Sequence, residues 1–208
     1  MDCRTKTGLK MFAMEAVADF RTVGAVTPSS RYLTQAMLRP LPLARARVVV
    51  ELGPGTGAMT RALLDLIRFD AVLLAFEINR CFTRYLRSNI PDSRLVVINA
   101  SADTIQNEVH HRGYERVDAV VSSLALGLMA ERPRHTFLAQ LRSLLDDASI
   151  FTQYQYFHRL QMENGQLRKF CAAHLLRQHF RSVEQKIIWR NLPPAFVFAC
   201  GKPLRDTH

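Results

Sequence analysis

The sequence lacks the features that define several classes of protein. Its four cysteines are scattered, none forms a C-x-x-C pair, and no H-E-x-x-H motif occurs. These absences exclude the common zinc spacings, so no catalytic metal is expected. No stretch rich in proline, glycine or serine divides the 208 residues, and a chain of this length can bury one sizeable core. We expect one domain over residues 1–208, with a helical N-terminal segment at 1–47 and the ligand-binding core at 48–200.

Long apolar runs are also missing. The basic start MDCRTKTGLK is followed by an apolar stretch that Glu15 and Asp19 interrupt, which fits neither a signal peptide nor a membrane-spanning helix. We therefore expect a cytoplasmic protein. Apolar residues still recur here at helical spacing, forming one stripe flanked by Lys10 and Arg21, with the members Leu9, Phe12, Ala13, Ala16, Val17 and Phe20. This pattern predicts a helix that packs on its own core or lies at a membrane surface.

Negative charge is scarce at both ends of the chain. Basic residues outnumber acidic residues by 8 to 3 in residues 1–47 and by 9 to 3 in residues 151–208, whereas residues 48–150 hold 11 and 12. The net charge is +10. Nucleic acid phosphates and anionic lipid headgroups both attract Lys and Arg through the same screened Coulomb interaction. Charge therefore leaves the choice between them open.

Hydrophobic periodicity indicates the fold class. Strand-like apolar runs alternate with helix-like segments, and they lie at residues 48–52, 71–76, 94–98, 117–122, 149–154 and 195–200. This alternation predicts an α/β fold, with a mostly parallel sheet covered by helices on both faces. In such open sheets the ligand crevice lies beyond the carboxyl ends of the strands. The loops after the strands are therefore the expected place for the chemistry.

The loop after the first predicted strand is rich in glycine. The stretch VVVELGPGTG at 48–57 leads into a helix-like segment at 58–68. Glycine lets the backbone turn tightly and lets a ligand approach its N–H groups, and the helix N-terminus favours a polar or anionic group. An ordinary glycine turn is the alternative. Because strand, loop and helix occur in this order, we favour a ligand site.

Polar residues follow the second and third predicted strands. Glu77, in LLAFEINR, lies twenty residues after Gly57, where this topology places an acid that accepts hydrogen bonds from both ribose hydroxyls. A solvated charge at the end of a strand is the alternative. In INASADTI, the small polar residues Asn99, Ser101 and Asp103 are suited to contact an adenine edge or, as simply, to cap a helix.

Two nucleoside cofactors fit this pattern, a nicotinamide dinucleotide and S-adenosylmethionine. Gly53, Gly55 and Ala58 satisfy the dinucleotide spacing, so a dehydrogenase is one alternative. Glu51, however, precedes the first glycine, where the methionine end of S-adenosylmethionine is expected. The run of an acid and three alternate glycines resembles the first motif of class I S-adenosylmethionine-dependent methyltransferases.

Further stretches resemble the bacterial phospholipid N-methyltransferases, over roughly residues 8 to 200. They are FRTVGAVTPSSRYLTQAM, VSSLALGLM, FTQYQY and NLPPAFVF, in this order along the chain. The resemblance implies methylation of phosphatidylethanolamine towards phosphatidylcholine, or of an ornithine lipid. It also implies an anionic membrane surface as partner, no nucleic acid partner, and attachment of the N-terminal helix to the inner face of the plasma membrane. An amine attacking the sulfonium methyl needs alignment and a dry cavity more than a strong base.

The resemblance also implies a set of site residues. Those expected to bind S-adenosylmethionine are Glu51, Gly53, Gly55, Thr56, Gly57, Glu77, Ile78, Ser101, Ala102 and Ser122. Those expected to contact the lipid are Tyr32, Leu124, Asn191 and Pro193. The candidates to accept the ammonium proton or to hold the amine by cation–π contact are Tyr154, Tyr156, His158 and Ser123. Tyr154 and Tyr156 also fit a half-buried strand, with both side chains in the core.

Two departures from the family keep other functions open. Relatives often carry Ser-x-Leu-Pro after the fourth strand, whereas this chain has Ser123-Leu124-Ala125-Leu126, or a run led by Ser122. Ser101 stands where many methyltransferases have an acid beside adenine. An RNA adenine dimethyltransferase shares the sheet and the charge, but it usually has an Asn/Asp-Leu-Pro-aromatic clamp for a flipped base, which this chain lacks. A non-catalytic membrane-binding module is the third possibility.

Overall fold

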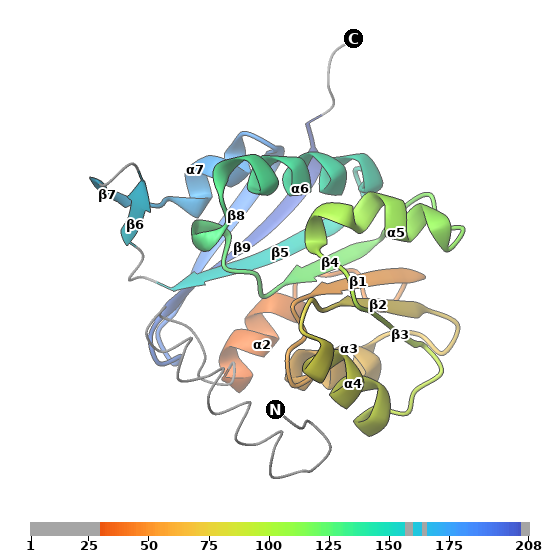
Figure 1. Ribbon diagram of the computed structural model, residues 1–208. Coiled ribbons are helices and arrows are strands. Elements are labelled where there is room, and N and C mark those ends of the chain that lie inside the picture. The colour runs from red at the N-terminus through yellow and green to blue at the C-terminus, as the bar shows by residue number, and fades with distance from the viewer. Residues whose placement is uncertain (1–29, 157–159, 164–165, 205–208) are drawn as a thin grey trace.

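The fold is built on one large sheet. The structure is a computed structural model that describes residues 30–156, 160–163 and 166–204. Seven strands form the sheet in the order β3-β2-β1-β4-β5-β9-β8 (Figure 1). Their bounds are β1 Val48–Leu52, β2 Val72–Phe76, β3 Leu95–Ile98, β4 Ala119–Ser122, β5 Ile150–Tyr156, β8 Phe180–Ile188 and β9 Ala195–Pro203. A separate hairpin pairs β6 Leu160–Glu163 with β7 Gln166–Lys169.

Strand direction confirms the predicted α/β class. Strands β1 to β5 pair in parallel, whereas β9 pairs antiparallel with both β5 and β8. The chain builds outward from β1 to β3, then returns to the other side of β1 with β4. The order of strands therefore reverses between β1 and β4, which is where open parallel sheets bind their ligands.

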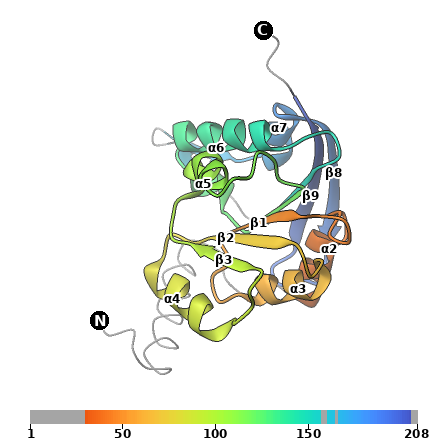
Figure 2. The same ribbon diagram turned by 90° about the vertical axis from the view of Figure 1, so that its right-hand side faces the viewer.

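Helices cover both faces of the sheet. The helices α2 (Arg31–Leu38), α3 (Ala58–Leu66) and α4 (Arg80–Asn89) lie on one face (Figure 1). The helices α5 (Ile105–His111), α6 (Glu131–Leu144) and α7 (Ala172–Arg177) lie on the other, as a second view also shows (Figure 2). Two short 3-10 turns, η1 (Ala102–Thr104) and η2 (Leu126–Leu128), follow β3 and β4. They belong to the loops at the carboxyl edge.

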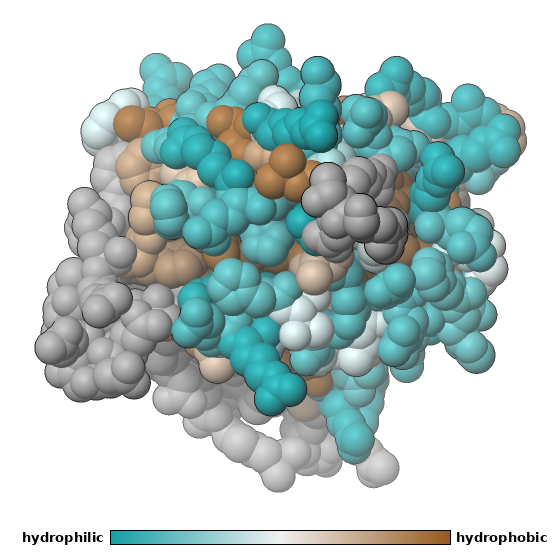
Figure 3. Space-filling view, turned by 90° about the horizontal axis from the view of Figure 1, so that it is seen from above, coloured by the Kyte–Doolittle hydropathy of each residue, from teal (hydrophilic) through white to brown (hydrophobic). Residues whose placement is uncertain are grey.

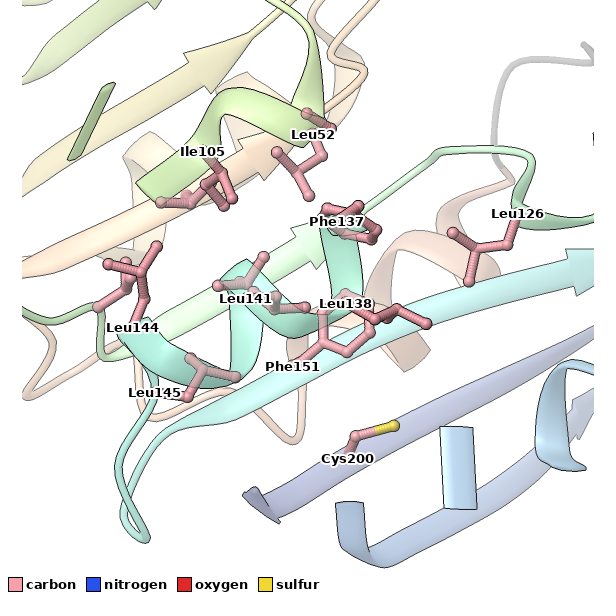
Figure 4. Close-up of a cluster of buried hydrophobic side chains, with 14 of the residues drawn as sticks. Leu52, Ile105, Leu126, Phe137, Leu138, Leu141, Leu144, Leu145, Phe151 and Cys200 are labelled. Carbon is pink, nitrogen blue, oxygen red and sulfur yellow. The ribbon is translucent and has the colours of Figure 1, made fainter. Parts of the chain in front are cut away.

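The core on the α6 face explains why this helix forms. Its apolar residues recur at helical spacing, and Phe137, Leu138, Leu141 and Leu144 are all fully buried. They pack over Leu52 and Phe151 of the sheet (Figure 4). Burial of each such side chain contributes about 1.5–3 kcal/mol relative to leaving it in water. The outward-facing surface of this helical layer is mostly hydrophilic (Figure 3), as an amphipathic helix requires.

Strand β8 was not predicted from the sequence, and its position explains why. Its segment FRSVEQKII alternates poorly, and Arg181, Glu184 and Lys186 are exposed. Because β8 lies at the edge of the sheet, it needs no continuous apolar run, and charged side chains there discourage pairing with other chains. The six predicted strands, by contrast, agree with the observed bounds to within a few residues.

The predicted apolar stripe between Leu9 and Phe20 lies outside the described residues. Among the residues that the structure does describe, no helix combines the length and the apolar character needed to span a membrane.

Gly57 offers a test of how the glycine loop is fixed. Its φ is +81°, and an added Cβ would lie 2.6 Å from Ile90 Cδ1 and 2.7 Å from Leu86 Cδ2. The change Gly57→Ala combines left-handed strain of about 1–2 kcal/mol with overpacking of about 1–3 kcal/mol. Gly113→Ala is the matched control, because φ is +80° there and nothing lies within 4 Å. Urea unfolding should show the larger loss for Gly57→Ala, and equal losses would contradict close packing of the loop on α4.

Candidate functional site

Four loops meet at the carboxyl edge of the sheet. They follow β1, β2, β3 and β4, and because these strands are parallel and adjacent, their loops emerge side by side. The loop after β1 touches the loop after β4, since a Cβ on Gly53 would lie 3.4 Å from Leu124 Cδ2. The predicted cofactor residues and several predicted acceptor residues are thus brought together at one edge.

The three glycines of the first loop are required for different structural reasons. Gly53, Gly55 and Gly57 all have positive φ, between +54° and +81°, a region that side chains disfavour. At Gly55, an added Cβ would meet nothing within 4 Å, so the backbone there borders open space. At Gly57, by contrast, an added Cβ would collide with Leu86 of α4 and with Ile90. Gly55 is therefore the position at which a ligand can come closest to the loop.

Glu51 is a buried acid directly before the loop. Its side chain is fully buried, and Thr60 Oγ1 donates a hydrogen bond of 2.7 Å to Glu51 Oε2. Within the described part of the chain, Oε1 accepts none. Burial raises the pKa of Glu51 from its ordinary 4.5 to about 8, the Thr60 hydrogen bond lowers it, and the charge of Glu77 raises it further. A cation placed near Glu51 would stabilise its ionised form.

Glu77 stands at the end of β2 and faces the glycine loop. Its Oε2 accepts a hydrogen bond from the Gly55 amide at 3.1 Å, and its Oε1 accepts one from the Asn79 amide at 2.8 Å. Burial raises the pKa of this carboxyl, while the backbone N–H groups lower it. Each oxygen retains acceptor capacity beyond its one bond. The carboxylate is thereby oriented for the pair of hydroxyls expected of a ribose.

Ile78 and Asn99 complete this side of the site. The Ile78 side chain is 72% exposed, which is unusual for isoleucine and leaves an apolar surface beside Glu77 for a flat ring. Asn99 Nδ2 donates to the carbonyls of Glu77 at 2.7 Å and Ile78 at 3.1 Å. Asn99 therefore fixes the loop after β2, a role other than the adenine contact considered from the sequence.

The loop after β3 carries the remaining predicted adenine contacts. Ser101 is exposed, and Ala102 is buried at the start of η1. Among the described residues the Ser101 side chain makes no capping bond to η1, so the capping alternative is not observed. Its hydroxyl faces solvent at the same edge as Ile78.

The loop after β4 carries several of the residues predicted to contact the acceptor. Ser122 is fully buried, and its Oγ accepts a hydrogen bond from the Leu124 amide at 3.2 Å. Ser123 donates its backbone N–H to the Leu52 carbonyl. Gln153, opposite Ser122 on β5, donates from Nε2 to the Leu124 carbonyl at 2.8 Å. Two hydrogen bonds thus fix Leu124 without the proline that relatives often carry.

The two tyrosines of β5 lie on the face of the sheet that α2 covers. Tyr156 is almost fully buried and Tyr154 partly buried, with ring centroids 5.3 Å apart and the rings nearly perpendicular. Tyr156 belongs to the same apolar cluster as Leu33 and Met37 of α2. This is the core placement that strand alternation predicted, while the hydroxyl's part in proton transfer stays a prediction. His158 lies outside the described residues.

The α2 helix and the β8–β9 connection contain the remaining residues predicted to contact the lipid, and these two segments lie against each other. Asn191 is buried, its Oδ1 accepts a hydrogen bond from the Ser30 amide at 3.2 Å, and its Nδ2 donates to the Pro193 carbonyl at 2.7 Å. The ring of Tyr32 lies beneath the guanidinium groups of Arg31 and Arg190, at 4.9 and 5.3 Å. Asn191 therefore joins the β8–β9 connection to the start of α2, whereas Tyr32 contacts two arginine side chains.

Thr60 and Gln153 were not identified from the sequence. Thr60 lies in the first turn of α3, three residues after Gly57, and turns to the buried acid. Gln153 is a buried polar residue in the middle of β5, and its Oε1 lacks a partner among the described residues. A glutamine at an inward position of FTQYQY was the available signal, but the neighbouring tyrosines drew the chemical interpretation.

Comparisons with known proteins bear on this geometry. No family model matches the chain. It is similar to the ornithine lipid N-methyltransferase of Singulisphaera acidiphila, at 27% identity over 186 residues that cover 86% of this chain and 88% of the relative. A shorter match, 42% identical over 73 residues, links it to ribosomal RNA small subunit methyltransferase A of Bordetella pertussis, but covers 35% of this chain and 26% of that protein.

Solved structures agree with the fold. One of them is the 1,6-didemethyltoxoflavin-N1-methyltransferase of Burkholderia thailandensis, crystallised with 1,6-didemethyltoxoflavin and S-adenosylhomocysteine. The TM-score is 0.66 at 20% identity, over 92% of this chain and 87% of that chain. The predicted class I methyltransferase fold is confirmed, and so is the predicted likeness to lipid N-methyltransferases.

The buried Glu51 predicts a pH dependence of stability. Because folding raises its pKa from 4.5 to about 8, the folded chain binds more protons than the unfolded chain between these values. The free energy of unfolding therefore falls as pH rises through this window, by up to about 1.4 kcal/mol per pH unit. Urea unfolding of the unmodified chain and of Glu51→Gln, measured from pH 5 to 9, should give a difference that changes with pH. A constant difference would mean that Glu51 titrates normally.

Proposed function

We propose that the chain transfers a methyl group from S-adenosylmethionine to the primary amine of a membrane lipid. Phosphatidylethanolamine and ornithine lipid are the candidate acceptors. The chain is an S-adenosylmethionine-dependent methyltransferase of the class I fold. The lipid acceptor is the proposal, and it rests on similarity to an ornithine lipid N-methyltransferase over nearly the full length of both chains.

The carboxyl-edge residues fit the cofactor. Gly55 leaves the loop backbone open to close approach, Glu77 offers acceptors for two ribose hydroxyls, and exposed Ile78 provides an apolar surface for adenine. Glu51 would gain a negative charge once the cationic methionine end lies beside it, and its Oε1 lacks a partner among the described residues. When bound, S-adenosylmethionine supplies a methyl group on a sulfonium, which is already a good leaving group.

The protein's remaining task is to align the acceptor and exclude water. Bound S-adenosylmethionine would supply its methyl group to the deprotonated amine, where a carbon–nitrogen bond would form as the sulfur–methyl bond breaks and leaves its electron pair on sulfur. In this proposal the loop held by Ser122 and Gln153 lines the path of the amine, because Leu124 lies against Gly53 at the cofactor edge. Tyr154, nearer the surface than Tyr156, is suited to contact a methylated ammonium through its ring.

Localisation and partners follow from the acceptor. A lipid substrate requires contact with a bilayer, so we propose peripheral attachment at the cytoplasmic face of the plasma membrane, with anionic lipids as the partner surface. The basic, apolar stripe between Leu9 and Phe20 is one candidate for this contact. Basic side chains near an anionic surface each contribute about 1 kcal/mol.

A ribosomal RNA acceptor is the second candidate, favoured by the 73-residue match to the Bordetella methyltransferase. That match spans about a quarter of the RNA enzyme, whereas the lipid enzyme matches over most of both chains. The run from Ser122 to Leu126 also lacks the clamp for a flipped base. The observations therefore favour the lipid. The dehydrogenase alternative is not supported, because the relative and the structural neighbour are methyltransferases.

The acceptor is tested directly by following the methyl group. Methyl-labelled S-adenosylmethionine is incubated with the full chain and vesicles containing phosphatidylethanolamine and ornithine lipid, and in parallel with ribosomal RNA. We expect label in the lipid extract and none in RNA. Label in RNA alone would overturn the lipid proposal, whereas label in only one lipid would identify the headgroup.

The ribose assignment is tested at Glu77. Glu77→Ala should weaken S-adenosylhomocysteine binding by about 1–3 kcal/mol, because charge-assisted hydrogen bonds to the hydroxyls are lost. Glu115→Ala is the matched control, since that side chain is 86% exposed and remote from the carboxyl edge. Titration calorimetry on both variants decides the question. Equal affinity in a folded Glu77→Ala protein would refute the assignment.

A further inference from the structure

The turn between β8 and β9 exposes large apolar side chains. Trp189 is 68% exposed, Leu192 81% and Ile187 38%. Arg31 and Arg190 stand beside them, with their guanidinium groups over the Tyr32 ring at 4.9 and 5.3 Å. We call these five residues, Arg31, Ile187, Trp189, Arg190 and Leu192, the hairpin patch. Exposed tryptophan and leucine next to arginine are unfavourable in water and match the boundary between headgroups and acyl chains.

The charge around the hairpin patch has one sign. Residues 30–38, which end with helix α2, and residues 185–195, around the turn, contain no Asp or Glu. Within the described ranges, neither Arg31 nor Arg190 forms an ion pair. Because both guanidinium groups lie over the same ring, their positive charges repel each other. An anion bound near both groups would reduce this repulsion. Hydrogen bonds from Arg31 and Arg190 lower the pKa of the Tyr32 hydroxyl, and the charge of Arg190 lowers it further.

The hairpin patch lies at the edge that holds the cofactor site. Strand β8 runs antiparallel to β9, which runs antiparallel to β5, so β8 ends at the same edge as β1 to β5 (Figure 1). The turn is also fixed rather than loose, because Asn191 bonds both the Ser30 amide and the Pro193 carbonyl. A flat surface pressed on this turn would therefore face the loops after β1 and β4.

We propose that the hairpin patch docks on an anionic lipid bilayer, with Trp189 and Leu192 entering the interface and Arg31 and Arg190 contacting lipid anions. This inference rests on the proposed function and deepens it, because it presents the headgroup amine to the edge where the methyl group is bound. Of the exposed apolar residues, Phe69 provides the contrast. It is 88% exposed but precedes β2 at the opposite edge, beside the paired charges of Arg68 and Asp70.

The chain contains one tryptophan, so its fluorescence reports on the hairpin patch alone. The full chain is mixed with vesicles of phosphatidylglycerol and phosphatidylcholine, and with vesicles of phosphatidylcholine only. We expect the Trp189 emission to shift to shorter wavelength, and to be quenched by brominated acyl chains, only with the anionic vesicles. The shift should weaken as salt rises. Sedimentation with anionic vesicles while the emission stays unchanged would overturn the proposal.

Matched variants separate docking from folding. Trp189→Ser and Leu192→Ser should each weaken partitioning into anionic vesicles by about tenfold, through lost apolar burial. Arg31→Gln and Arg190→Gln should each weaken it about fivefold at low salt. Phe69→Ser and Arg45→Gln, exposed changes at the opposite edge, should leave it unchanged. Unfolding midpoints and S-adenosylhomocysteine affinity should match the unmodified chain in every case.

The outcomes distinguish this inference from the proposed function. If the patch variants bind vesicles like the unmodified chain while lipid is still methylated, the docking proposal fails and the function stands. If the chain docks through Trp189 but labels RNA instead of lipid, the function fails and the docking surface remains. If Phe69→Ser weakens binding to anionic vesicles as much as the patch variants do, the binding is nonspecific and the proposal is overturned.

Discussion

The parallel pairing of β1 with both β2 and β4 is the constraint on which the rest of the site depends. It buries the middle of the sheet on both faces, so polar groups there can emerge only where the strands end. Because the pairs are in register from Val48 with Val72 to Leu52 with Ser122, the strands also end together. An acid, a glycine loop, a second acid and a serine are thereby gathered at one edge from distant parts of the chain.

At that edge, polar side chains form hydrogen bonds with one another and with the backbone of the loops. Thr60 holds Glu51, Asn99 holds the loop of Glu77 and Ile78, and Gln153 holds Leu124. Such second contacts fix the groups that would otherwise need to be ordered when a cofactor binds. The result is a site whose donors and acceptors are already oriented, with Gly55 and Ile78 left open beside them.

The sequence indicated strands β1 to β4 and the loops after them well, because these elements depend on local pattern. Apolar runs ending in Glu51, Glu77 and Ser122 fix both the strands and the residues at their tips. The packing of α2 on the β8–β9 turn depends on contacts between distant segments. Nothing in the local sequence shows that Asn191 reaches Ser30, or that Arg190 lies over Tyr32. Strand β8 was missed for a related reason, since an edge strand needs a partner more than an apolar run.

The bond from Asn191 to Ser30 joins residues 161 positions apart, and this separation has a consequence for synthesis. Chains emerge from the ribosome N-terminus first, and segments that complete their own contacts can fold before the rest exists. Strand β4 pairs with β5, and β5 pairs with β9, so the sheet gains its full set of contacts only when its last strand has been made. The bond that anchors the β8–β9 turn is therefore among the last contacts to form, although Ser30 is among the first described residues to be synthesised.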